Sequence, residues 1–185
     1  MLCQGDNYFC QGLNKITLLD LFKLMQIRLA KHADIQWIQQ IFLHAKQIMA
    51  SIGNSHQWKE NYPSIELIQQ DISHKNCYVC IKDNEIIGTF SCIKGEDPTY
   101  LHIENGDWLN NEAYITLHRI ATKGVVKGLT AFIFDWCFKK HPNIRIDTHQ
   151  DNTIMRYILE KEEFQECGVI YVDDGSPRIA YQKSI

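Results

Sequence analysis

The sequence predicts a single α/β domain, of mixed α+β type, in which helices cover both faces of a mixed β-sheet. Three observations lead to this prediction. The 185 residues suit one domain of ordinary size. Strand-like and helix-like segments follow one another in the order β, α, α, β, β, β, α, β, α, β, β. A glycine-bearing turn joins a central strand directly to an apolar helix.

The first predicted elements begin at Met25. Residues 25–30 alternate between apolar and polar side chains, which is typical of a strand. We expect Asp34 to cap a helix whose apolar positions follow helical spacing as far as Met49. The domain is therefore expected to span 25–185. Residues 1–24 are expected to form an extension, either with a short amphipathic helix over 15–24 or as sequence upstream of a start at Met25.

The next segments predict a short helix and a hairpin. Ser64 is placed to cap a helix over 65–72. Two strand-like runs, 77–81 and 85–93, are separated by Asp83-Asn84, a pair suited to a tight turn. An antiparallel hairpin follows from this spacing.

Residues 95–111 are rich in turn formers and predict a long surface loop. Its aromatic and acidic residues suit an amine-bearing ligand, so Tyr100, His102, Glu104 and Trp108 are candidates for substrate contacts. An ordinary packed loop is an equally good interpretation of the same residues.

The second half of the chain supplies the remaining elements. The expected elements are a strand over 113–121, a helix over 129–139, a strand over 144–148, a helix that starts after Asp151-Asn152 and ends near Glu162, and strands near 168–172 and 179–182.

The charge balance argues against nucleic acid as a partner. Lys and Arg number 19 and Asp and Glu 22, giving a formal charge of −3 and no broad basic field. Polar residues interrupt the apolar stretch 13–24, so no membrane association is expected.

The seven cysteines are an odd number, scattered along a chain without a secretory signal, which indicates reduced thiols and a cytoplasmic location. Cys77 and Cys80 have C-x-x-C spacing but lie in a strand-like run, where residues three apart point to opposite faces. Buried thiols are therefore favoured over a zinc site, and no metal is expected.

The turn between 121 and 129 is the strongest candidate for a ligand site. A strand that passes through glycine directly into a helix presents unpaired N–H groups and the positive end of the helix dipole, which suit a pyrophosphate. Lys123 and Lys127 add positive charge there. Taken alone, the segment is equally consistent with an ordinary loop bearing solvated lysines.

Leu117 to Thr130 resembles the core of the GNAT superfamily of acyl-CoA-dependent N-acyltransferases, in which a splayed fourth strand leads into an [RQ]-x-x-G-x-[GA] pyrophosphate loop. The first strand and helix, the hairpin and the run from Asn152 to Phe164 match as well, so the resemblance covers nearly all of 25–183. It implies a mostly antiparallel sheet with a splay between strands 4 and 5. Val125 and Thr130 depart from the loop motif, and Gly128 fits it.

The resemblance also implies acetyl-CoA as acyl donor and a set of cofactor contacts. The strand backbone is expected to pair with the pantetheine amides, the loop to hold the pyrophosphate, and the Asn that opens the last helix to touch the cofactor, a role compatible with helix capping. The expected cofactor-binding residues are Leu117, Ile120, Ala121, Lys123, Gly124, Val125, Val126, Lys127, Gly128, Leu129, Thr130 and Asn152.

Acylation of an amine requires a base, and the candidates are His118, Tyr114 and Glu112. With strand periodicity, Tyr114 and His118 share one face and Arg119 lies on the other. Histidine is the side chain whose ordinary pKa best suits a base near neutrality. A hydrogen-bonded sheet histidine is the competing interpretation, and Tyr114 stands where some GNAT relatives carry a glutamate.

The general acid is less evident. The family's usual tyrosine is replaced by Leu159, and Tyr157 is rotated by about 200° from that position on a helix. Water or another group would then protonate the thiolate. Asp147, His149 and Asp151 are interpreted as polar anchors of a loop rather than as a metal site.

The sequence therefore predicts an N-acetyltransferase that transfers acetyl from acetyl-CoA to a primary amine of a small molecule or peptide by direct attack. A homodimer is compatible with this prediction. An acyl-CoA-binding regulatory module of the same fold is the first alternative, and an unrelated α/β phosphate binder is the second.

Overall fold

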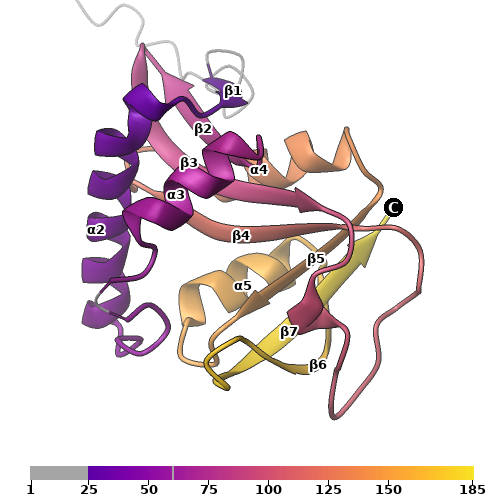
Figure 1. The fold of residues 1–185 in the computed structure, drawn as a ribbon. Coiled ribbons are helices and arrows are strands. Elements are labelled where there is room, and N and C mark those ends of the chain that lie inside the picture. The colour runs from indigo at the N-terminus through magenta and orange to yellow at the C-terminus, as the bar shows by residue number, and fades with distance from the viewer. Residues whose placement is uncertain (1–24, 60) are drawn as a thin grey trace, which may run out of the picture.

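The computed structural model describes residues 25–59 and 61–185. The predicted extension 1–24 lies outside the described residues. The structure confirms the predicted order of elements (Figure 1). The strands are β1 (Met25–Leu29), β2 (Cys77–Lys82), β3 (Glu85–Lys94), β4 (Ile115–Thr122), β5 (Asn143–Thr148), β6 (Gln165–Tyr171) and β7 (Pro177–Ser184). The helices are α2 (Ile35–Ser51), α3 (Ile65–Ser73), α4 (Leu129–Phe138) and α5 (Thr153–Lys161), with 3-10 turns η1 (His32–Asp34) and η2 (Pro98–Tyr100).

The described strands form one sheet in the order β1-β2-β3-β4-β5-β7-β6. Neighbouring strands are antiparallel except β4 and β5, which are parallel. The β4–β5 pairing is short and ends at Leu117, which lies opposite Ile146. Beyond this point the two strands are no longer paired, which confirms the expected mixed α/β fold with a splay between strands 4 and 5.

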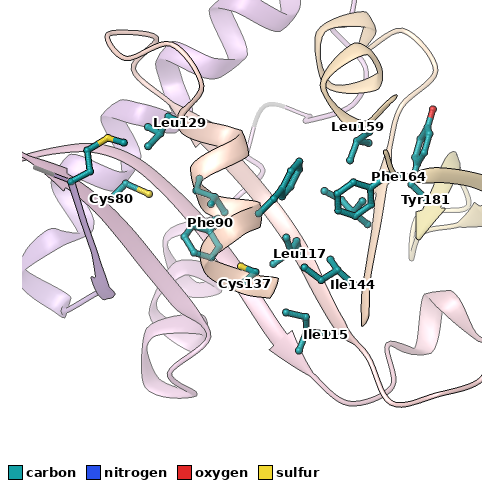
Figure 2. Packing of buried hydrophobic residues seen from close by; sticks show 14 of the residues in the cluster. Cys80, Phe90, Ile115, Leu117, Leu129, Cys137, Ile144, Leu159, Phe164 and Tyr181 are labelled. Atoms are coloured by element: carbon teal, nitrogen blue, oxygen red, sulfur yellow. The ribbon is translucent and has the colours of Figure 1, made fainter. Parts of the chain in front are cut away.

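The helices cover both faces of the sheet (Figure 1). One face packs against α2 and α3 through side chains such as Ile38, Ile68 and Val79. The other packs against α4 and α5, whose residues Cys137 and Leu159 share one core with residues of the central strands such as Leu117 (Figure 2). Burying two apolar stripes of helices on one sheet is the layered arrangement that the alternating pattern predicts.

The cysteine pair of the C-x-x-C spacing is divided between these two layers. Cys77 belongs to the α2–α3 core and Cys80 to the α4–α5 core. The expectation that the two thiols face opposite sides of the sheet is confirmed. Within the described part of the chain, no group of three or more His, Cys, Asp or Glu side chains is arranged to hold a metal ion.

Local signals for the short elements are mostly confirmed. Ser64 accepts a hydrogen bond from the Leu67 N–H at 3.2 Å and caps α3. Asp83 and Asn84 adopt φ values of 49° and 64°, the left-handed conformation that a two-residue hairpin turn requires. The predicted capping role of Asp34 is wrong. Its carboxylate accepts from the Lys31 N–H and pairs with Arg28 at 2.6 Å, and it makes no cap hydrogen bond to α2.

The segment 95–111 is packed into the domain rather than lying on its surface throughout. Tyr100 is 1% exposed, its ring stacks on Trp108, and Trp108 Nε1 donates to the Tyr100 carbonyl at 3.0 Å. Glu104 pairs its backbone with Val169 in β6. Tyr100 and Trp108 therefore pack within the domain, whereas His102 and Glu104 are exposed. In the part of the chain that the structure describes, no helix is both long enough and apolar enough to cross a membrane.

Candidate active site

A cavity of about 930 Å³ opens where β4 and β5 separate. Its walls come from the second half of β4, the start of α4, the end of β5, the start of α5, and α2 and α3 on the facing side. Because β4 loses its partner after Leu117, the backbone groups of residues 118–122 on the β5 side have no neighbouring strand. A ligand in the opening can therefore pair with that edge as a strand would.

The turn between β4 and α4 depends on two glycines. Gly124 has φ 70° and Gly128 has φ 80°, a conformation that L side chains rarely adopt. Gly128 is the N-cap of α4 and supplies no side chain to the helix N–H groups. Ser64 and Asn152, by contrast, cap their own helices with side-chain oxygens. The free N–H groups and the positive dipole end of α4 are thus left available to an anion.

A third glycine allows α4 to start close to the sheet. A Cβ on Gly88 would lie 2.9 Å from Cδ2 of Leu129 and 3.2 Å from the Ala121 carbonyl oxygen. Leu129 is 2% exposed and anchors the first turn of α4 in the core. The close contact fixes the helix start relative to β4, and so fixes the turn.

The predicted cofactor residues divide into two groups. Those that line the cavity are Leu117, Ile120, Ala121, Gly124, Thr130 and Asn152. The other six predicted residues belong to the same turn but do not line the cavity. Lys127 and Val125 are exposed, Val126 and Leu129 pack on the core, and Lys123 Nζ lies 6.0 Å from the ring centroid of Trp37.

Asn152 has the capping role that the sequence suggested. Its Oδ1 accepts from the Met155 N–H at 3.1 Å, and its Nδ2 donates to Gln57 Oε1 at 2.9 Å. Both residues line the cavity. The cap therefore links the start of α5 to the segment after α2, across the opening.

A bulge in β4 places His118 and Arg119 on the same side of the sheet. His118 lies opposite Ser91 of β3, whereas Ala121 lies opposite Thr89, so β4 has one extra residue between these pairs. Arg119 adopts φ 53° at this point, and its Nε donates to Ser91 Oγ. The predicted location of Arg119 on the opposite face is wrong, because regular alternation does not continue through a bulge.

His118 lies between two carboxylates. Its Nε2 is 2.7 Å from Asp97 Oδ2, and its Nδ1 is 3.7 Å from Asp147 Oδ1. His118 and Asp147 are the first residues beyond the last β4–β5 pair, so they face each other across the start of the opening. Tyr100 donates to Asp147 at 2.7 Å and packs edge-on against the imidazole.

The Asp97 carboxylate is held by several donors. Burial raises the pKa of its carboxyl group, but hydrogen bonds from His118 and Thr99 outweigh burial and bring the pKa to about 2. The Thr99 N–H and hydroxyl both donate to Oδ1, which leaves Oδ2 for the imidazole. Asp97 is therefore a fixed anion that orients His118.

Tyr114 and Glu112 do not line the cavity. Tyr114 is 8% exposed, its hydroxyl accepts from the Asp97 N–H, and the Arg145 guanidinium lies 4.0 Å from its ring centroid. Glu112 is exposed and precedes β4. Of the three predicted bases only His118 lines the cavity, because Tyr114 and Glu112 precede β4, which begins at Ile115. Tyr114 instead supports the loop that carries Asp97.

Arg119 forms a second polar group beside His118. Its guanidinium lies 2.6 Å from Asp71 of α3, and Asp71 also accepts from Ser91 at 2.7 Å. Arg119 and Asp71 side chains are each 9% exposed. Tyr62 accepts from the same guanidinium at 3.3 Å. This ion pair ties α3 to the bulge and fixes the backbone next to His118.

The lining of the cavity as a whole is rich in carboxylates. The lining acids are Asp71, Asp97, Asp147, Asp173 and Asp174, and the lining Lys and Arg residues are Lys59, Arg119 and Arg178. Arg178 Nε lies 3.8 Å from Asp147, and Lys59 lies 2.6 Å from Asp174. Five carboxylates against three Lys and Arg side chains leave the lining as a whole with an excess of negative charge that attracts an ammonium group.

Most of the other residues that the sequence suggested for the site lie outside the lining of this cavity. Tyr100, His102, Glu104 and Trp108 do not line the cavity, and the loop contributes Asp97, Pro98 and Thr99 instead. His149 and Asp151 form a local turn, with the Asp151 N–H donating to His149 Nδ1, while Asp147 faces His118. Leu159 is fully buried in the core, and Tyr157 is 65% exposed and lies outside the cavity lining.

The comparison with solved structures decides the family. A GNAT-family acetyltransferase from Streptococcus agalactiae has a TM-score of 0.79 and 34% sequence identity, covering 87% of this chain and 95% of that one. The chain belongs to the GNAT family.

Two more distant members share the fold. A GNAT-family acetyltransferase from Listeria monocytogenes has a TM-score of 0.63 at 19% identity, with 87% of this chain and 95% of that chain covered. An acetyltransferase from Salmonella typhimurium that modifies the N-terminal serine of ribosomal protein L7/L12 has a TM-score of 0.57 at 15% identity, covering 88% and 95%. No protein-family model matches the chain, and no curated protein matches it.

Proposed function

We propose that this GNAT protein transfers the acetyl group of acetyl-CoA to a primary amine of a small molecule or peptide by direct attack. One observation carries the proposal. The free edge of β4, the uncapped start of α4 and the Asp97–His118 pair all border a single cavity whose lining contains more carboxylates than Lys and Arg side chains. Those features supply a place for the thioester, a place for the pyrophosphate, a base and an attraction for the amine.

The cofactor is assigned to the β4 side of the cavity. The pyrophosphate would accept hydrogen bonds from the first N–H groups of α4, in the turn from Gly124 to Thr130. The pantetheine amides would pair with the unpartnered backbone after Leu117. Together these contacts place the thioester beside His118, and the N–H groups of the β4 edge polarise its carbonyl.

His118 is assigned as the general base. When Nε2–H is donated to Asp97, Nδ1 is the ring atom that accepts a proton, and it faces Asp147 across the opening. An ammonium group attracted by Asp147 would thus lie next to the atom that deprotonates it. The neutral amine then attacks the thioester, and the collapse of the tetrahedral adduct expels the thiolate.

Departure of the thiolate needs little help in this site. Leu159 is buried where a phenol would otherwise stand, and Tyr157 lies outside the cavity lining. A thiol of ordinary acidity, with a pKa of about 8.5, is a good leaving group near neutral pH. Water or the imidazolium formed at His118 then returns the proton.

The buried Leu159 is also the observation that favours a second candidate, an acyl-CoA-binding module without efficient turnover. Acetyl-CoA and a panel of amines separate the two. The panel includes diamines, amino acid amides and peptides with a free N-terminus, because one neighbour of the fold modifies an N-terminal serine. The acetylated amine is measured by mass spectrometry, which avoids interference from the seven thiols of the chain.

Amine-dependent product supports the transferase. Tight binding of acetyl-CoA with no product from any amine supports the binding module. Absence of acetyl-CoA binding, measured by calorimetry on the same sample, contradicts both functions.

A further inference from the structure

A second cavity, of about 650 Å³, lies at the end of the sheet where β2 begins, β3 ends and β4 begins. The segment after α3 closes one side of it and the segment after α4 closes the other. Tyr78, Cys92 and Ile115 contribute strand residues to its wall. This cavity takes no part in the proposed acetyl transfer.

The second cavity is basic. Among the described residues its lining contains Lys75, Lys94, Lys140 and two histidines, His74 and His141, and it contains no carboxylate. None of the three lysines forms an ion pair with a described carboxylate. The C-terminal dipole ends of α3 and α4 offset only about half a charge each. Three ammonium groups therefore leave a net positive field.

Cys92 is a thiol in the wall of this basic cavity. It is half-buried and packs against the α4–α5 core, in which Cys137 of α4 is buried (Figure 2). A hydrogen bond with the Cys137 thiol lowers the pKa of Cys92, burial opposes this shift, and the charges of Lys94 and Lys140 lower it further. A lowered pKa increases the thiolate fraction of a thiol that lines a cavity that attracts anions.

The other described cysteines lack this combination. Burial raises the pKa of Cys77 to about 11 and that of Cys80 to about 12. The pKa of Cys137 is raised by its hydrogen bond with Cys92 and by burial, and that of Cys167 is raised by burial. Among the cysteines that the structure describes, reactivity at neutral pH is therefore expected to be selective for Cys92.

We propose that Cys92 is a thiol–disulfide exchange site that selects small disulfides carrying carboxylate groups. The carboxylates are held by Lys75, Lys94 and Lys140 while the Cys92 thiolate attacks one sulfur of the disulfide. A bond forms between Cys92 Sγ and that sulfur, the original S–S bond breaks, and the other half leaves as a thiolate. The protein gains a mixed disulfide, and one equivalent of small thiol is released.

The modified site would adjoin the main cavity. His74, Asn76 and Ile93 line both cavities, and Ile93 lies opposite Thr116, two residues before His118. A group bound covalently at Cys92 thus lies behind the wall of the candidate active site.

Three disulfides of different charge test the proposal on the full-length protein. Oxidised glutathione carries carboxylates, 2-hydroxyethyl disulfide is neutral, and cystamine carries two ammonium groups. Mixed-disulfide formation is followed at pH 7 and low salt by intact mass and peptide mapping. Each rate is divided by the rate of the same reagent with a free cysteine peptide.

We expect Cys92 to be modified first, and oxidised glutathione to be favoured over cystamine by about tenfold or more, with the ratio falling as salt is added. The double variant Lys94→Gln/Lys140→Gln removes most of this preference. Lys82→Gln/Lys161→Gln, which changes the net charge equally at residues that do not line the cavity, retains it. Cys92→Ser abolishes the fast reaction.

Two results would overturn the proposal. One is equal normalised rates for oxidised glutathione and cystamine in the wild-type protein. The other is peptide mapping that places the first modification on a different cysteine. Neither result bears on acetyl transfer, so the two proposals stand or fall separately.

Discussion

The two cavities of this protein are both lined by residues of β3 and β4 but have opposite electrostatic character. The lining of the main cavity includes five aspartates and His118, and that of the second includes three lysines, two histidines and Cys92. Residues His74, Asn76 and Ile93 form part of both walls. The helix termini and loops at the strand ends therefore determine the charge of each cavity. An acidic wall suits a base that deprotonates an ammonium group, and a basic wall suits a thiolate.

The largest expected effect comes from removing the candidate base of the main cavity. His118→Gln keeps a side chain that can hydrogen-bond to Asp97 but removes the base, and we expect kcat for amine acetylation to fall by about 10²- to 10⁴-fold. Binding of acetyl-CoA, measured by calorimetry, should change little because its contacts are mainly backbone. His74→Gln, on the shared wall, is the matched control and should retain most activity. Equal losses in the two variants would argue against a base role for His118.

The ion pair beside His118 is expected to dominate the stability of the main cavity. Asp71→Asn leaves the buried Arg119 guanidinium without its carboxylate, which should lower the free energy of unfolding by about 3 kcal/mol. Asp174→Asn removes the partner of the exposed Lys59 and should cost less than about 1 kcal/mol. Urea unfolding of the two variants measures the difference. Similar losses would show that burial does not distinguish these pairs.

Asp97 gives the main cavity a predicted acid sensitivity. Its folded-state pKa of about 2 lies below the ordinary value of 3.8, so its carboxylate contributes stability that is fully present above about pH 4. This contribution is lost as the pH falls from 4 toward 2, because the proton binds the unfolded state more tightly. Asp97→Asn should lower the free energy of unfolding by about 2 kcal/mol at pH 6, with a smaller difference near pH 2.5. A pH-independent difference would contradict the pairing with His118.

The smallest expected effect comes from the second cavity. Cys92→Ser and Lys94→Gln/Lys140→Gln alter only that cavity, so acetylation rates with a good amine substrate should stay within about twofold of wild type. Steady-state assays at saturating acetyl-CoA measure this. A large loss in the unmodified variants would show that the two cavities are not separable in function.

Most of the fold follows from sequence because its signals are local. Ser64, the Asp83-Asn84 turn and the apolar spacing of α2 each specify their element through neighbouring residues. Gly128 likewise marked the start of α4 correctly. The prediction that Asp34 caps α2 was wrong because a carboxylate near a helix start can bind other partners than the helix N–H groups. Here it binds Arg28 and the Lys31 N–H.

The candidate site was harder to predict from the sequence because it is assembled from segments that lie far apart in the chain. The sequence singled out His118 as a candidate base, but not its two partners. Asp97 lies on a loop 21 residues before it, and Asp147 lies after it in β5. The bulge at Arg119 reverses the alternation on which face assignments depend, and no local pattern marked it. Tyr114 lies outside the cavity lining, and β4 begins one residue after it. Such features depend on strand register, which single residues do not specify.

A crystal structure of this protein with bound acetyl-CoA is the most direct test that the β4–β5 opening is the cofactor site. We expect the pyrophosphate on the N–H groups between Gly124 and Thr130, the pantetheine along β4 after Leu117, and the thioester beside His118. Acetyl-CoA bound elsewhere, with the β4–β5 opening filled by side chains or solvent, would contradict it.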